Sequence, residues 1–153
     1  MNKEKTIIFI GLAIIISTVL YGGLAYGLWF FKSFKIPLPE AGIGNKLGMI
    51  FSLVSLSFLI SARPIREKVW NMRKKTVVSQ ESFYAGYTSC VVLEAVILES
   101  VAVLGLVLFM LTGDVKFSLS LIVISLLVQI VNLSAKYNIE QKKEEFIQFF
   151  YKG

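Results

Sequence analysis

Residues 91–133, VVLEAVILESVAVLGLVLFMLTGDVKFSLSLIVISLLVQIVNL, contain two long apolar stretches separated by Thr112-Gly113-Asp114. A Thr-Gly-Asp sequence is typical of a turn. A transmembrane helix needs about 20 predominantly apolar residues to cross a hydrocarbon core about 30 Å thick. We therefore predict a helical hairpin with spans at residues 83–111 and 115–134.

Two further apolar stretches precede this hairpin, at residues 6–31 and 46–62, and Pro37 and Pro39 interrupt the chain between them. The chain has 153 residues, of which 56% are hydrophobic. A soluble domain of this size would expose too much apolar surface, which points to lipid as the solvent. The predicted fold class is all-α, a polytopic membrane protein with four transmembrane helices in an antiparallel bundle that forms one domain over residues 1–135.

The two remaining segments are polar. In residues 63–82, Ile65, Val69 and Met72 recur at helical spacing, so this segment is predicted to be a short helix on the membrane surface or a solvated basic loop. In the tail, residues 136–153, Phe146, Phe149 and other apolar residues share one face of a predicted C-terminal amphipathic helix. That helix is expected to lie on the bilayer or to dock on a soluble partner.

The distribution of basic residues predicts the orientation. With four spans, both termini and the central basic segment lie on one side of the membrane. Of the 16 Lys and Arg residues, only Lys32, Lys35, Lys46 and Lys116 fall on the other side. Because cytoplasmic loops carry the excess of Lys and Arg, we place both termini in the cytoplasm of a bacterium, with the protein in its plasma (inner) membrane.

Two acidic residues, Glu94 and Glu99, lie inside the third predicted span. Glu99 is about 18 Å from the outer end of that span, close to the middle of the bilayer. Within the four predicted spans the only Lys or Arg residues are Lys46 and Lys116, which lie at the outer ends of the second and fourth spans, so no ion pair is expected in the membrane core. We predict that Glu99 is largely neutral at pH 7, because desolvation disfavours the charged carboxylate.

The amides of the fourth span are the predicted partners of these carboxyl groups. In a hairpin that turns at Gly113-Asp114, Glu99 is level with Gln129 and Glu94 lies near Asn132, so we predict a hydrogen bond in each pair. Further possible partners are Ser55, Ser89, Thr18 and Tyr21. Glu94 and Glu99 point about 140° apart on a helix. Glu99 is therefore interpreted either as a proton or cation carrier, with Gln129, Glu94 and Asn132 beside it, or as a protonated group that hydrogen-bonds across helices.

Small residues recur at four-residue spacing in the first two spans. Gly23 and Gly27 form a G-x-x-x-G motif, and Gly44, Gly48 and Ser52 continue the same spacing around the start of the second span. Such faces allow helices to approach closely. They predict either packing within the four-helix bundle or an interface between copies of the chain.

Residues 99–107, ESVAVLGLV, resemble the carboxylate helix of the c-type (proteolipid) subunits of rotary ATPases, and Ala62-Arg63-Pro64 is similar to the polar loop of that family. The resemblance implies an ion-carrying role for Glu99. The chain departs from the family in having about 36 residues between Arg63 and Glu99 and a further span after the carboxylate. As a whole it resembles small bacterial four-span membrane proteins of no assigned function at least as closely.

The composition argues against catalysis. The chain has no histidine and one cysteine, Cys90, and it has no phosphate-binding glycine loop. We expect no enzyme activity, no metal, no cofactor and no binding of nucleic acid. The first hypothesis is an accessory or assembly subunit that acts through helix packing, with a protein partner or a second copy, and the alternative is proton or cation translocation through Glu99. A basic face is expected to contact membrane lipids or a partner; it consists of Arg63, Arg66, Lys68, Arg73, Lys74 and Lys75.

Overall fold

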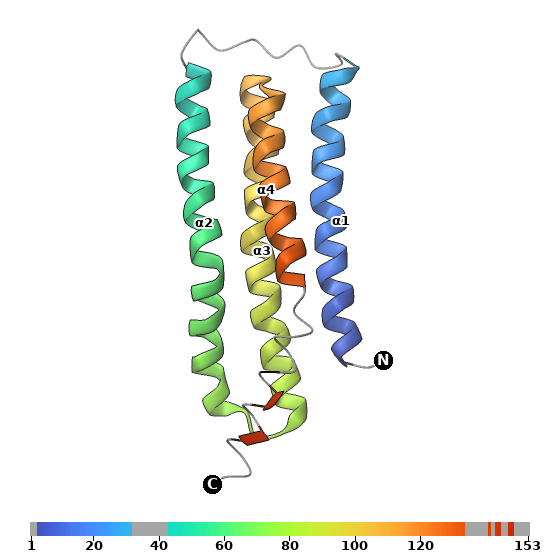
Figure 1. Ribbon diagram of the computed structural model, residues 1–153, viewed down its shortest axis with the longest axis vertical. Helices are drawn as coiled ribbons and strands as arrows, with labels where there is room; N and C mark the ends of the chain where they lie inside the picture. Colours follow the sequence, from blue (N-terminus) through green and yellow to red (C-terminus); the bar gives the residue numbers. More distant parts are fainter. Residues whose placement is uncertain (1–2, 32–42, 134–140, 142, 145–146, 149–153) are drawn as a thin grey trace.

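The computed structural model describes residues 3–31, 43–133, 141, 143–144 and 147–148. Its elements are α1 (Lys3–Phe30), α2 (Ile43–Arg73), the short 3₁₀ helix η1 (Lys74–Thr76), α3 (Gln80–Thr112) and α4 (Val115–Leu133). The four α-helices lie side by side along the long axis, with α3 and α4 between α2 and α1 (Figure 1). The described residues contain no strand.

All four α-helices are long and apolar enough to cross a membrane. This confirms the predicted all-helical class with four candidate spans. The helices α1, α3 and α4 cover the predicted spans to within a few residues at each end. The predicted amphipathic tail helix falls largely outside the described residues.

The second helix is longer than predicted. The segment 63–82 was expected to be a separate surface helix or a loop, but α2 continues without a break through Pro64 to Arg73, over 31 residues. Proline removes one backbone hydrogen bond and usually ends or kinks a helix. Here the buried face of α2 continues past the proline, because Ala62, Arg66 and Trp70 all lie in the interior. Contacts with α3 thus extend the helix beyond its apolar part.

The predicted turn at Thr112-Gly113-Asp114 is confirmed. Gly113 has φ 69°, a left-handed conformation that favours glycine, and its amide donates to the carbonyl of Phe109 at 2.8 Å. The Asp114 carboxylate accepts from the amide of Phe117 at 3.1 Å and caps the start of α4. The chain therefore stops one helix and starts the next within two residues.

The register of α3 against α4 follows from their contacts. A Cβ atom on Gly105 would lie 2.9 Å from both Ile122 Cγ1 and the Ser118 carbonyl oxygen, so the two backbones approach closely there. Further from the turn, Ser125 Oγ donates to the Leu98 carbonyl at 2.6 Å. The residue numbers of facing pairs therefore sum to about 225.

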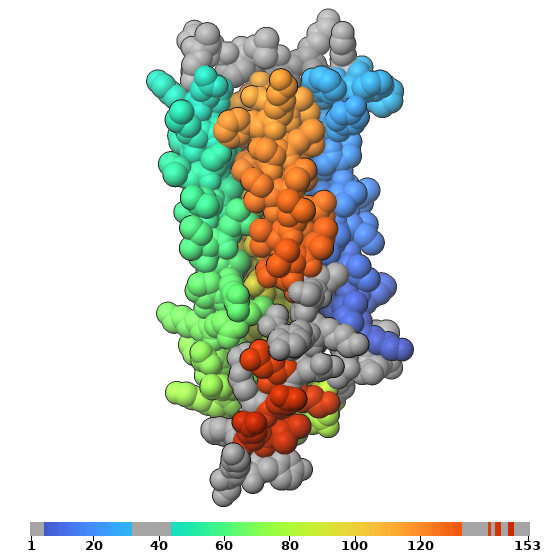
Figure 2. All heavy atoms as spheres, viewed as in Figure 1, coloured from blue at the N-terminus to red at the C-terminus, as the bar shows by residue number. Residues whose placement is uncertain are grey.

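The C-terminal end of α2 and the N-terminal end of α3 lie opposite the Gly113 turn. Both project past the C-terminal end of α4 (Figures 1 and 2). An aromatic cluster fills the projecting part: Trp70 packs edge-on against Phe83 and Tyr87, with ring centroids 5.3 and 5.4 Å apart. Ser79 caps the start of α3 through a reciprocal pair of hydrogen bonds with Ser82. This packing makes the α2–α3 end an ordered helical hairpin.

The distribution of side chains is inverted relative to that of a soluble protein. Large apolar side chains are exposed along all four helices; examples are Phe9 (70% exposed), Leu53 (66%), Val96 (48%) and Val131 (69%). Several polar side chains are instead fully buried, namely Thr18, Ser55, Ser118 and Ser125. In water this arrangement would be costly, since apolar surface is exposed while polar groups lose solvent. It is the arrangement that a lipid environment favours.

The small-residue motifs divide into two groups. Gly48 packs on the ring of Phe117, 3.4 Å from where its Cβ would lie, as packing within the bundle predicts. A Cβ on Gly23 or Gly27 would meet nothing within 4 Å among the described residues, so this motif makes no close contact inside that part of the bundle, and an interface between copies stays a prediction. Gly44 lies in the first turn of α2, and Ser52 is half-buried.

Candidate functional site

The most polar part of the interior is an ion pair between α2 and α3. Arg66 Nη1 donates to Glu94 Oε2 at 2.7 Å, and both side chains are almost fully buried, with 6% and 4% of their surface exposed. Arg66 Nη2 donates to Glu67 Oε1 at 2.8 Å, and the Glu67 side chain is 34% exposed. The chain of charges therefore leads from the surface of α2 into the bundle.

This pair corrects two predictions. No cation was expected in the membrane segments, but the extension of α2 to Arg73 brings the Arg66 guanidinium opposite Glu94. Arg66 was also expected at the basic face that contacts lipid or a partner, and it lies in the interior instead. The other members of that set are exposed on α2 and η1: Arg63, Lys68, Arg73, Lys74 and Lys75.

The predicted contact between Glu94 and Asn132 is present. Asn132 Nδ2 donates to Glu94 Oε1 at 3.4 Å, beyond the usual 2.7–3.2 Å of N–H···O bonds. The Glu94 carboxylate thus has a short partner on one oxygen and a long one on the other. Since Asn132 lies in the last turn of α4, Glu94 is level with the end of that helix.

The predicted Glu99–Gln129 hydrogen bond is wrong. Both Ser17 Oγ and Tyr21 Oη of α1 donate to Glu99 Oε1, the latter at 3.2 Å. At the observed register Glu99 is level with residues near Ser125, about one turn from Gln129. Its side chain also points away from α4, because the face of α3 that packs there carries Glu94, Leu98 and Gly105 at helical spacing.

Gln129 belongs to a separate hydrogen-bond network. Thr18 Oγ1 donates to Gln129 Oε1 at 3.1 Å, and Gln129 Nε2 donates to Ser125 Oγ at 3.1 Å. Ser125 in turn donates to the carbonyl of Leu98. Three helices, α1, α3 and α4, are joined in this way by groups that are all buried.

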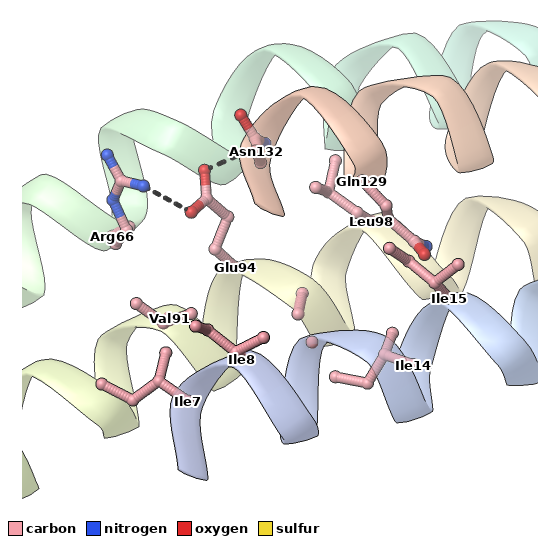
Figure 3. Close-up of a pocket in the computed structure, with 12 residues that line it drawn as sticks. Ile7, Ile8, Ile14, Ile15, Arg66, Val91, Glu94, Leu98, Gln129 and Asn132 are labelled. Carbon is pink, nitrogen blue, oxygen red and sulfur yellow. Dashed lines mark hydrogen bonds and ion pairs between the residues drawn. The ribbon is translucent and has the colours of Figure 1, made fainter. Parts of the chain in front are cut away.

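A cavity of about 40 Å³ adjoins both networks. Figure 3 shows its two sides: isoleucines of α1 lie opposite the Arg66–Glu94 pair and the amides of Gln129 and Asn132. All four helices contribute to the lining. The cavity is therefore lined mainly by apolar side chains of α1 and α3, and its polar groups are Arg66, Glu94, Gln129 and Asn132.

Sequence reasoning missed several members of this interior. Thr18 and Tyr21 were considered as possible partners of the carboxyl groups, but Ser17 was not, although the hydroxyl pair Ser17-Thr18 interrupts an apolar run. Within the described part of the chain, Ser89 Oγ donates to the Ala85 carbonyl of its own turn and reaches neither carboxyl group. Ser55 is 1% exposed, and its hydroxyl has no hydrogen-bond partner among the described residues.

The chemistry of the site is that of ion pairing and hydrogen bonding. In the part of the chain that the structure describes, no three His, Cys, Asp or Glu side chains lie close enough together to hold a metal ion. Comparison with protein-family models, with curated proteins and with solved structures found no match to this chain.

Proposed function

We propose that the chain is a non-catalytic, multi-pass membrane protein that acts as an accessory or assembly subunit through the outward face of α1. In this proposal the four helices form an antiparallel bundle in the bacterial plasma membrane. The termini and the projecting α2–α3 end lie in the cytoplasm, where the exposed basic residues face anionic lipid headgroups. The inverted distribution of apolar and polar side chains supports the insertion.

One observation carries the proposed role. Gly48 and Gly105 are both used for close packing inside the bundle, whereas in the part of the chain that the structure describes a Cβ on Gly23 or Gly27 would meet nothing within 4 Å. Leu20 lies on the same face of α1 and is 65% exposed. Small residues at this spacing let a second helix approach closely. The face is therefore free for a helix of a partner or of a second copy.

The test is site-specific photo-crosslinking in cell membranes. A photoreactive residue in place of Leu20 is expected to give a discrete protein adduct, whereas one in place of Leu127, exposed on α4, is expected to give none. Gly23→Ile should abolish the adduct without changing the fold, because that position is open. A self-adduct would identify a homo-oligomer. Equal labelling from both positions, or an adduct that survives Gly23→Ile, would refute the proposal.

A second candidate, ion translocation through Glu99, has one observation in its favour. Glu99 is half-buried, level with the middle of α4, and its described hydrogen-bond partners are two hydroxyl groups. A carboxyl at this depth that is bonded to neutral groups is able to gain and lose a proton or to hold a cation.

Transport and structural roles of Glu99 differ in their response to Glu99→Gln. In proteoliposomes under an imposed potential, a carrier is expected to move protons or cations, and Glu99→Gln should stop this flux. Glutamine keeps an acceptor oxygen for Ser17 and Tyr21, so the fold should persist. Wild-type flux equal to that of protein-free vesicles would exclude translocation.

A further inference from the structure

The cavity lies where the polar interior meets the projecting end of the bundle. Its outer part is next to the Arg66–Glu94 pair, and Arg66 is bonded in turn to the partly exposed Glu67. Its wall on α1 runs from Ile7 to Ile15, roughly 12 Å at the rise of an α-helix. The cavity thus leads inward from the level at which α4 ends.

The polar groups around the cavity are suited to holding water. A cavity of about 40 Å³ exceeds the roughly 10–15 Å³ that one water needs. Among the described residues, Glu94 Oε1 accepts only the long bond from Asn132, which leaves it able to accept a better one. A buried carboxylate is stable only when its remaining lone pairs are hydrogen-bonded. Water next to Glu94, Asn132 and Gln129 would meet that requirement.

The inner end of the cavity is close to Glu99. Ile14 lines the cavity, and the hydroxyl oxygens of Ser17 and Thr18 both lie within hydrogen-bonding distance of its carbonyl oxygen. Ser17 also lies within hydrogen-bonding distance of Glu99, and Thr18 donates to Gln129, which lines the cavity itself. One turn of α1 therefore separates the cavity from the carboxyl in the middle of the bundle.

We propose that this cavity is a water-filled inlet that brings solvent from the α2–α3 end of the bundle to within one helical turn of Glu99. The ligand of the site is water, held by Glu94, Asn132 and Gln129. The inlet rests on the membrane insertion proposed above, and it gives Glu99 a route for exchange with the aqueous phase on one side only.

The test uses two neighbouring cysteines in a Cys90→Ala background. Ile15 lines the cavity, whereas Ile16 is 59% exposed on the outer face of α1. Ile15→Cys and Ile16→Cys are the same chemical change at nearly the same depth. Each protein in vesicles is treated with aminoethyl methanethiosulfonate, and the remaining thiols are counted after denaturation. Because such reagents react with the thiolate, a thiol in water should react about tenfold or more faster than one in lipid.

Three outcomes are distinguishable. Fast labelling of Ile15→Cys with slow labelling of Ile16→Cys supports the inlet, and Gly11→Leu, which adds a side chain to the cavity wall, should then slow the Ile15→Cys reaction. Slow labelling of both overturns the inlet and leaves membrane insertion intact. Fast labelling of both overturns insertion, and with it the inlet. Should Ile15→Cys fail to fold, Ile8→Cys provides a second position on the same wall.

Discussion

Neutralising Glu94 should destabilise the protein strongly. In Glu94→Gln, Arg66 keeps its charge in a site where only 6% of its side-chain surface is exposed. Removing one partner from a buried ion pair costs about 3–5 kcal/mol. Two contacts reduce this figure, since Arg66 still donates to Glu67 and the new amide oxygen is able to accept one bond. We therefore expect a loss of about 2–4 kcal/mol in the free energy of unfolding.

The assay is unfolding by sodium dodecyl sulfate in mixed micelles, followed by the fluorescence of Trp70 in a Trp29→Phe background. Trp70 reports on the site because it packs against Tyr87 on the same pair of helices. Glu67→Gln is the matched control: its carboxylate bonds to the same guanidinium but is partly exposed. We expect that control to cost about 1 kcal/mol or less.

The double variant Arg66→Met/Glu94→Leu tests whether the loss in Glu94→Gln comes from the unpaired charge of Arg66. Replacing both members of a buried ion pair by apolar side chains is often neutral or stabilising. The double variant should therefore recover most of the free energy of unfolding that Glu94→Gln loses. A Glu94→Gln protein as stable as the Glu67→Gln control, or a double variant no more stable than the single one, would refute the buried ion pair.

The same unfolding assay checks three further predictions. Gly105→Ala should lose about 1–3 kcal/mol, since its Cβ would meet backbone and side chain at 2.9 Å, whereas Gly23→Ala, in open space, should lose nothing. Thr18→Val should lose about 0.6–2 kcal/mol with its interhelical hydrogen bond; Thr88→Val, whose hydroxyl bonds within its own turn, should lose less. Phe83→Leu should lose about 0.5–1.5 kcal/mol with its edge-on contact to the indole and should also shift the tryptophan emission.

The features that sequence reasoning predicted correctly depend on local signals. Four candidate spans follow from the length of the apolar stretches, and the turn follows from Gly113 and Asp114, whose conformational and capping preferences are intrinsic. Neither requires knowledge of which helix packs against which. The helices and the turn were therefore readable from the chain alone.

The length of α2 could not be predicted from local sequence signals. Hydropathy falls after Ala62, and Pro64 is a helix breaker, so both local signals favour an end near residue 62. The helix continues because Arg66 forms an ion pair with Glu94 of α3 and Trp70 packs against Phe83 of α3. These tertiary contacts override the local preference, and they also supply the cation that the span prediction excluded.

The pairing of the interior polar groups failed for a related reason. The predicted register differs from the observed one by about three residues, which is close to one turn of a helix. A slip of that size changes depth by roughly 4.5 Å and changes the direction of a side chain much less; Glu94 and Asn132 still meet because their numbers sum to 226, close to the observed register. Glu99 points about 140° away from Glu94 around α3, and the direction of a side chain around a helix decides its partner. Glu99 therefore bonds to α1, where the sequence predicted α4.

The attachment of α1 links the two interpretations of Glu99. The outward face of α1 is apolar or glycine, and its inward face is held to α3 and α4 by Ser17, Thr18 and Tyr21. Each such bond in a membrane contributes about 0.6–2 kcal/mol. Two of the three end on Glu99, so any change in its charge or solvation also changes how firmly α1 is held. Because the proposed partner face lies on that same helix, ion exchange at Glu99 and assembly through α1 would be coupled through these hydroxyl contacts.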